Sequence, residues 1–191
     1  MNRRRILLLF HWLTALLVAL SFTIAWLRKP VEDLAVRAFW LDVHRSIGMI
    51  VLLLTVTRLG LRGRKGPISK GEDLPVAMWI ASRLTHVLLY AGLIAMPLLG
   101  WAQSSAKVRH LNLFGVPIPA LVRHNRDLAD SFGWWHEQVG WALLALIGLH
   151  AAAGLFHHYV RRDDVLRSML PRGKPITAKV PSEVQTFDIA A

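Results

Sequence analysis

The chain has 191 residues, of which 54% are hydrophobic, and its mean hydropathy of +0.40 is too high for an ordinary soluble domain. Its formal net charge of +11 comes from basic residues that are unevenly distributed among the termini and loops. Such a distribution indicates the orientation of a membrane protein, so we expect no nucleic-acid partner. The absence of cysteine excludes disulfides, iron–sulfur ligation and the C-x-x-C-H attachment of c-type haem.

Four apolar stretches are long enough, or nearly so, to cross a hydrocarbon core of about 30 Å. The first covers residues 6–27, with His11 as its only ionisable residue. It exceeds the length of a signal-peptide core and no A-x-A-like site closes it, so we expect a retained helix. The second covers residues 44–61 and is the weakest, because Arg45 and Arg58 lie near its ends.

The third stretch covers residues 84–105 and contains His86 and Pro97. Before the fourth stretch, residues 111–133 form the longest outer connection, which we expect to fold back over the bundle as a cap. The fourth stretch, within residues 130–160, has no charged residue from position 138 onward.

These spans predict an all-α integral membrane protein, a four-helix up-down-up-down bundle. The N-terminus, the loop after the second span and the C-terminal segment together hold 14 Lys/Arg against 6 Asp/Glu, and the other two loops hold 8 against 6. Basic residues gather on the cytoplasmic side of membrane proteins, so both termini should be cytoplasmic. We expect one transmembrane domain over residues 1–170, in a lipid bilayer, and a polar, mobile cytoplasmic tail over residues 171–191.

Histidines inside the apolar spans are the strongest functional signal, because ionisable side chains within a bilayer are costly and usually functional. His136 and His150 share the fourth span, where 14 residues place them about 40° from being in line and about 21 Å apart along the helix axis. Zinc sites need ligands clustered at i, i+3 or i+4, whereas two separated histidines suit two stacked haems.

Because successive spans run in opposite directions, histidines on other spans lie at the same depths as His136 and His150. These histidines can supply the second ligand of each haem. His11 lies level with His150 near the cytoplasmic surface, and His44 lies level with His136 near the outer surface. This arrangement predicts two non-covalent, six-coordinate b-type haems that transfer electrons, with His11 and His150 on the inner iron and His44 and His136 on the outer iron. His86 also lies in the cytoplasmic half, where it could replace His11 or only form a hydrogen bond; we favour His11.

Other polar residues near the spans have two interpretations each. Arg45 and Arg58 are placed to contact the anionic haem propionates, or equally to extend to the lipid headgroups. His157 and His158, seven and eight residues beyond His150, are either solvated at the interface or part of a quinone site together with Lys70.

Four segments resemble the bacterial cytochrome b561 family: "FHWLTALLV", "VHRSIGMIVLLLTVTRL", "RLTHVLLYAGLIAMPLLGW" and "WHEQVGWALLALIGLHAAAGLFHHYVRRDDVLRSMLPR". The resemblance covers about residues 5–173. It implies a four-helix, inner-membrane, di-haem b protein whose ligand positions correspond to His11, His44, His136 and His150. The spacing of the two histidines in the fourth span is shared with the cytochrome subunits of hydrogenases and formate dehydrogenases.

Within this family the chain is similar to the superoxide oxidase type. That resemblance implies an enzyme, a superoxide:ubiquinone oxidoreductase, in which periplasmic superoxide loses an electron to leave oxygen and ubiquinone becomes ubiquinol. Cations of the long outer loop would steer the anion toward the protein, and the candidates are Lys107, Arg109, Arg123 and Arg126.

Two alternatives differ in function class. The chain could be a cytochrome b electron-transfer subunit that links a periplasmic dehydrogenase or hydrogenase to the quinone pool. It could also be a ferric or ascorbate-linked reductase, although such proteins arrange their ligands over six spans. The absence of extra spans and long outer arms favours an enzyme without an obligate protein partner. The sequence does not decide between ubiquinone and menaquinone.

Overall fold

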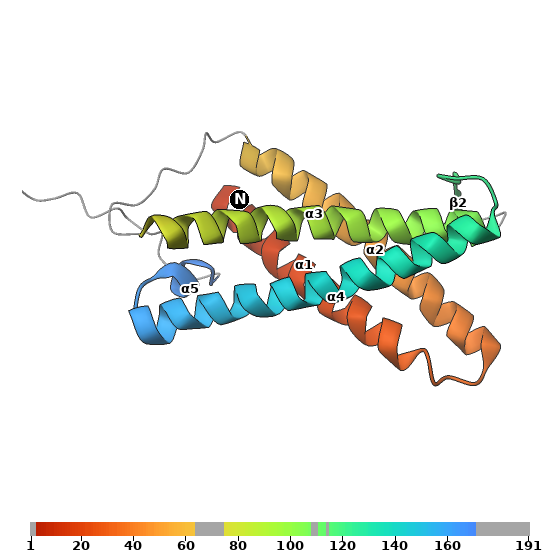
Figure 1. Cartoon of the computed structure of the whole chain (residues 1–191), viewed down its shortest axis with the longest axis horizontal. Helices are drawn as coiled ribbons and strands as arrows, with labels where there is room; N and C mark the ends of the chain where they lie inside the picture. Colours follow the sequence, from red (N-terminus) through yellow and green to blue (C-terminus); the bar gives the residue numbers. More distant parts are fainter. Residues whose placement is uncertain (1–2, 64–74, 108–110, 114, 171–191) are drawn as a thin grey trace, which may run out of the picture.

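The protein is almost entirely helical. The computed structural model describes residues 3–63, 75–107, 111–113 and 115–170 (Figure 1). Lys70, Arg109 and the predicted tail at 171–191 lie outside these residues. The elements in chain order are α1 (Arg3–Leu27), α2 (Leu34–Gly63), α3 (Val76–Lys107), β1 (Leu111–Leu113), β2 (Val116–Ile118), α4 (Arg126–Phe156), the π-helix η1 (His157–Arg161) and α5 (Val165–Ser168).

The long helices begin where short polar side chains can cap them. The Asp33 carboxylate accepts hydrogen bonds from the Ala35 and Val36 amides, at 2.8 and 3.1 Å, and starts α2. The Asn125 side chain accepts a hydrogen bond from the Leu128 amide at 3.1 Å and starts α4. Each cap satisfies amides that the first turn of a helix leaves without intrahelical partners.

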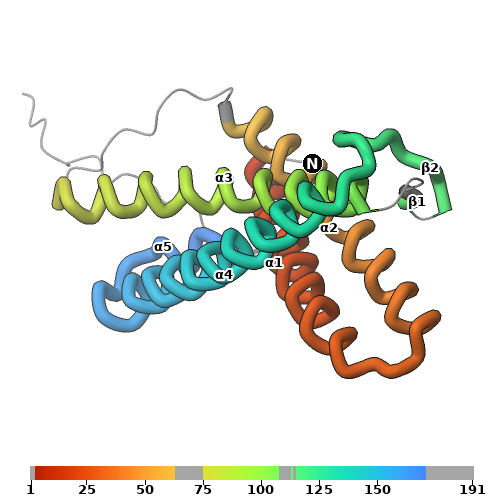
Figure 2. Tube along the Cα trace, turned by 45° about the vertical axis from the view of Figure 1, so that its right-hand side comes forward, coloured from red at the N-terminus to blue at the C-terminus, as the bar shows by residue number. Residues whose placement is uncertain are grey.

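The four long helices form two antiparallel hairpins, α1–α2 and α3–α4, that cross each other (Figures 1 and 2). Close backbone packing joins α1 to α2, α2 to α3 and α3 to α4. In the described part of the chain, the backbone of α4 makes no comparably close approach to α1 or α2. Side chains therefore fill the space between α4 and the first hairpin, and a small apolar core of Val18, Ile24, Ile47 and Val51 lies beside it.

The outer surfaces of the helices are apolar. All four long helices are long and apolar enough to cross a membrane, and large side chains such as Leu16, Leu53, Val87 and Leu149 are more than half exposed. In water such a surface would be a liability, whereas in a bilayer it faces lipid tails. The predicted four-helix membrane bundle is thus confirmed.

The helices differ from the predicted spans mainly at their outer ends. Residues 111–118 form a two-stranded antiparallel hairpin with Leu113 opposite Val116, and Gly115 takes a positive φ of 80° at its turn. The last third of the expected cap, from Arg126 onward, is the first two turns of α4. The outer loop is therefore shorter than predicted. Asn125 caps a helix that begins there, and Asp127 lies in the first turn of that helix.

The C-terminal end of α4 turns back on the bundle. The π-helix at His157–Arg161 ends at Arg162, which has a left-handed φ of 53°. The short helix α5 is then held against α1: the Arg4 guanidinium donates to the Ser168 carbonyl at 2.7 Å, and the Trp12 indole donates to the Met169 carbonyl at 2.8 Å. We call residues 157–170 the C-terminal elbow.

The packing of α3 on α4 predicts unequal effects of one substitution at two glycines. A Cβ at Gly92 would lie 3.0 Å from the Cδ1 atom of Leu143, which is only 3% exposed, whereas a Cβ at Gly60 would meet nothing within 4 Å. Both positions are helical, so Gly→Val changes intrinsic helix propensity equally. We expect Gly92→Val to be less stable than Gly60→Val by about 1–3 kcal/mol, since overpacked cores shift or strain. Thermal unfolding in detergent measures the difference, and equal midpoints would contradict this packing.

Candidate functional site

The outer histidine pair lies between α2 and α4. The rings of His44 and His136 have centroids 6.2 Å apart and planes inclined at 75°. A metal ion bound to one nitrogen of each ring would require two bonds of about 2 Å plus the two ring radii, which amounts to about 6 Å between centroids. The spacing therefore suits one iron held between the two rings.

Backbone carbonyls orient both rings of the outer pair. The Nδ1 atom of His136 lies 3.1 Å from the Met96 carbonyl oxygen on α3. The Nδ1 atom of His44 lies 3.1 Å from the Ser21 carbonyl oxygen and 3.0 Å from the Ser21 hydroxyl on α1. With its proton on Nδ1, each ring donates to a carbonyl and keeps the Nε2 lone pair for a metal, as metal-binding histidines usually do.

An apolar pocket surrounds this pair. Its cavity volume is about 60 Å³, and its lining combines the two imidazoles with the side chains of Val18, Phe22, Val51, Leu93 and Leu143. Gly48, one helical turn after His44, also lines the pocket, and a Cβ built on it would meet nothing within 4 Å. The pocket can therefore accept a flat apolar group against α2.

The inner histidines form a group of three. His11 on α1 and His150 on α4 have ring centroids 6.2 Å apart and planes inclined at 81°. His86 on α3 lies closer to His150, at 5.3 Å and 83°. The His11–His150 spacing equals that of the outer pair, whereas the His86–His150 spacing is shorter than two metal bonds require. The Nδ1 atom of His86 lies 2.6 Å from the Ser82 carbonyl oxygen in its own helix.

Arg58 lies beside His11. Its guanidinium donates to the Nδ1 atom of His11 at 3.1 Å and lies 5.8 Å from the centre of the Tyr90 ring. Since arginine can only donate, this contact leaves the remaining ring proton on Nε2 of a neutral His11. Binding of a metal at Nε2 would require the proton to be on Nδ1 and the guanidinium to turn away. The buried Tyr90 hydroxyl has no hydrogen-bond partner among the described residues, so the inner site also has a polar atom free for a ligand.

Arg45, predicted to contact a propionate or the lipid headgroups, links two helices at the outer end in the structure. Its Nε donates to the Ser104 hydroxyl on α3 at 3.1 Å, and its guanidinium pairs with Asp42 at 2.8 Å. Arg45 directly follows His44 in the chain, so both contacts lie close to the outer pair. Arg45 therefore has a fixed position near the outer pocket and a share of its charge already paired.

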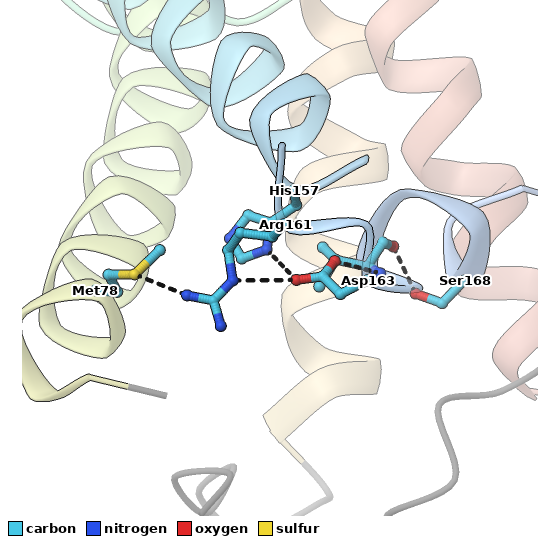
Figure 3. Close-up of polar contacts among 6 residues, drawn as sticks. Met78, His157, Arg161, Asp163 and Ser168 are labelled. Carbon is cyan, nitrogen blue, oxygen red and sulfur yellow. Dashed lines mark hydrogen bonds and ion pairs between the residues drawn. The ribbon is translucent and has the colours of Figure 1, made fainter. Parts of the chain in front are cut away.

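The C-terminal elbow fixes His157 (Figure 3). The Asp163 carboxylate lies 2.6 Å from the Nδ1 atom of His157 and 3.5 Å from the Nε atom of Arg161, and it accepts a hydrogen bond from the Val165 amide at 3.1 Å. Arg161 also reaches the Met78 sulfur on α3 at 3.2 Å. Burial alone would raise the pKa of Asp163, but the hydrogen bonds from His157 and Val165 and the charge of Arg161 lower it below its ordinary value of 3.8.

The remaining predicted residues do not come together at one site. His158 packs on the neighbouring Tyr159 ring at 4.8 Å and does not take part in the Asp163 contacts of Figure 3. Lys107, Arg123 and Arg126 are exposed at the outer end. The Asn125 amide donates to the Ala106 carbonyl at 3.1 Å, which brings the ends of α3 and α4 together there.

Several contributing groups escape sequence reasoning. Ser21 and the Met96 carbonyl hold the outer histidines, and Asp163 holds His157. A lone serine in an apolar span and a carboxylate in a charged interfacial run are common, so neither residue signals its role by type or spacing.

Comparison with known proteins gives a consistent result. The family model described as prokaryotic cytochrome b561 matches residues 2–172. The chain is 30% identical to cytochrome b561 homolog 1 of Escherichia coli (strain K12) over 167 residues, which cover 86% of this chain and 94% of that protein. It is 32% identical to the probable superoxide oxidase CybB of Yersinia pestis over 166 residues, which cover 85% and 92%. Cytochrome b561 homolog 2 of Escherichia coli (strain K12) is 28% identical over 173 residues, covering 84% and 87%.

The lowered pKa of Asp163 predicts a pH-dependent contribution to stability. Because the pKa is lower in the folded than in the unfolded chain, the stabilisation is complete above about pH 4 and is lost as pH falls through the folded-state value. We expect Asp163→Asn to cost about 1 kcal/mol at pH 6, reduced by solvent exposure, and less at pH 3. Thermal unfolding in detergent at both values measures this. Asp164→Asn is the matched control, because its 3.5 Å pair with Arg167 is exposed; an equal loss in both variants would refute the role of Asp163.

Proposed function

Because the chain belongs to the prokaryotic cytochrome b561 family of multi-pass bacterial membrane proteins, which transfer electrons with b-type haem, we propose that it is a superoxide:ubiquinone oxidoreductase. Two superoxide ions at the outer face lose one electron each and become oxygen. Ubiquinone at the inner face gains two electrons and two protons and becomes ubiquinol. The observation that carries this proposal is a pair of histidine rings 6.2 Å apart at each end of α4.

The residues at both levels fit b-type haem, and we propose one haem at each. When bound, the two haems supply one-electron transfer between the faces of the membrane. His44 and His136 would hold the outer iron through Nε2, while the Ser21 and Met96 carbonyls accept hydrogen bonds from their Nδ1 atoms. His11 and His150 would hold the inner iron. Arg58, which contacts Nδ1 of His11, and the unpaired Tyr90 hydroxyl would be the polar groups available to a propionate there.

Two histidine ligands on each iron restrict the chemistry of the protein. A haem held by two histidines would supply electron transfer and would offer oxygen no binding position on its iron. The pocket lining beside the rings of His44 and His136 is mostly apolar and offers water few hydrogen-bond partners. Superoxide therefore reacts from outside this pocket, after steering by the exposed cations Lys107, Arg123 and Arg126, together with Arg109.

The inner face binds the quinone and supplies its protons. His157 is supported by its 2.6 Å contact with Asp163, so one ring nitrogen is held and the other can meet a quinone oxygen. His158 lies in the same π-helical turn, and Lys70 belongs to the connection between α2 and α3. These three residues are the proposed quinone contacts. The excess of basic residues at this end supports cytoplasmic termini and an inner-membrane location.

Haem counting in variants tests the inner ligands. We expect His11→Ala and His150→Ala each to lower the haem content of the purified protein from about two to about one per chain, because a one-ligand site holds b haem weakly. His86→Ala is the matched control and should keep both haems. The pyridine haemochrome assay measures the ratio. Loss of a haem in His86→Ala with retention in His11→Ala would transfer the ligand role to His86.

A superoxide pulse tests the overall reaction. In purified protein in detergent, the pulse should reduce both haems rapidly, and added ubiquinone should then reoxidise them. His136→Ala should lose the rapid phase, because it lacks an outer ligand. Haems that ignore superoxide but accept electrons from quinol would favour the alternative function, an electron-transfer subunit that depends on a periplasmic dehydrogenase or hydrogenase.

A further inference from the structure

Three arginines lie near the outer ends of α1 and α2, at or beyond the level of His44. Arg28 directly follows α1, and Arg37 and Arg45 are on α2. The positive charges of Arg45 and Arg37 both act on Arg28, and the charges of Arg28 and Arg45 both act on the His44 ring. The three guanidiniums therefore form one electrostatic group, which we call the outer arginine cluster.

Helical spacing explains why these side chains converge. Arg28 lies seven residues beyond Ser21, the residue that holds His44, and Arg37 lies seven residues before His44 itself. Seven residues are nearly two turns, so each arginine shares a helix face with a pocket residue and lies about 10 Å nearer the outer surface. The Arg28 amide still bonds to the Ile24 carbonyl at 3.0 Å, so the helical path of α1 continues to this position.

The cluster has more positive charge than its described surroundings neutralise. Asp42 pairs with Arg45 at 2.8 Å, but no ion pair of Arg28 or Arg37 occurs among the described residues. The Nε atom of Arg28 is buried and has no hydrogen-bond partner there. Buried donors are almost always paired, and leaving one unpaired is costly. Partial burial, then the charges of Arg45 and Arg37, lower the pKa of Arg28 below its ordinary value, as expected for a cation that lacks an anion.

We propose that the outer arginine cluster is an oxyanion-binding site at the edge of the outer haem pocket, with Arg28 as its central donor. Guanidinium groups form forked hydrogen bonds to paired oxygen atoms, so the ligand chemistry is a carboxylate or a small dioxygen anion. The inference rests on the proposed function, which supplies two sources: the propionates of the outer haem, or superoxide arriving from solution.

This site differs from the steering residues proposed above. Lys107, Arg123 and Arg126 belong to the ends of α3 and α4, whereas Arg28 and Arg37 border the connection between α1 and α2 (Figure 1). Steering acts over distance and is screened by salt, whereas a buried Nε acts on a bound anion at hydrogen-bond range. The cluster therefore binds an anion at a defined place beside His44.

Two measurements on the haem-loaded protein test the site: the midpoint potential of the outer haem, by optical redox titration, and the second-order rate constant for haem reduction by pulsed superoxide. The variants are Arg28→Gln and Arg37→Gln. A third variant, Arg28→Lys, keeps the positive charge but removes the forked pair of hydrogen-bond donors. Lys29→Gln is the matched control, because it removes an exposed cation from the adjacent position. If Arg28→Gln fails to retain haem, the same comparison is made with Arg28→Lys.

The outcomes separate the two sources. A more negative potential in the Arg28 variant, but not in Lys29→Gln, identifies the propionates, whether or not the superoxide rate changes, because loss of a nearby cation disfavours the reduced haem. A superoxide rate reduced about tenfold at unchanged potential identifies superoxide as the ligand. Potentials and rates equal to those of Lys29→Gln would overturn the site. The potential is measurable even if superoxide is not the donor, so failure of the proposed function is distinguishable from failure of the site.

Discussion

The separation between α4 and the first hairpin is the constraint on which the rest of the structure depends. Apolar helices tend to pack until their backbones are close, yet α4 packs closely on α3 and keeps its distance from α1 and α2. Two histidine pairs span this space, with ring centroids 6.2 Å apart at both levels. Carbonyls from α1 and α3 hold the outer rings, so helices that contribute no ligand of their own at that level still determine where the ligands point.

The two ends of this space differ in their electrostatics. At the outer end, the charges of Arg37 and Arg45 act on Arg28, and the pocket beside His44 has a mostly apolar lining. At the inner end, Arg58 contacts His11 and Tyr90, and an aspartate holds His157 within the C-terminal elbow. A bilayer screens charges poorly, so a few fixed groups near each site have large effects on which ions and protons approach it. One scaffold can thereby favour anion entry at one face and protonation at the other.

The C-terminal elbow shows how a helix end becomes part of a site. A regular α-helix would continue straight past Phe156, but the π-helical turn and the left-handed Arg162 reverse the chain. The returning segment then bonds to α1 through Arg4 and Trp12, and Trp12 is adjacent to His11. π-Helical turns of this kind occur frequently at functional sites. The elbow thus connects the proposed quinone end to the helix that carries the inner ligand.

The sequence alone determined the four helices, the membrane, and the levels of the histidines. These features follow from local periodicity and composition: long apolar runs, a 14-residue spacing on one helix, and an uneven distribution of basic loops. It also contained the Asn125 cap, which marks the true start of α4 within the expected outer loop. The tertiary structure alone decided lateral distances. The depth of a residue in the bilayer does not determine that the ring centroids of His86 and His150 lie 5.3 Å apart or that the Ser21 carbonyl lies beside His44. Nor does it determine that the charge of Arg45 acts on Arg28. Such contacts depend on how the hairpins cross, and crossing is set by the packing of many side chains at once, which no single spacing in the sequence records.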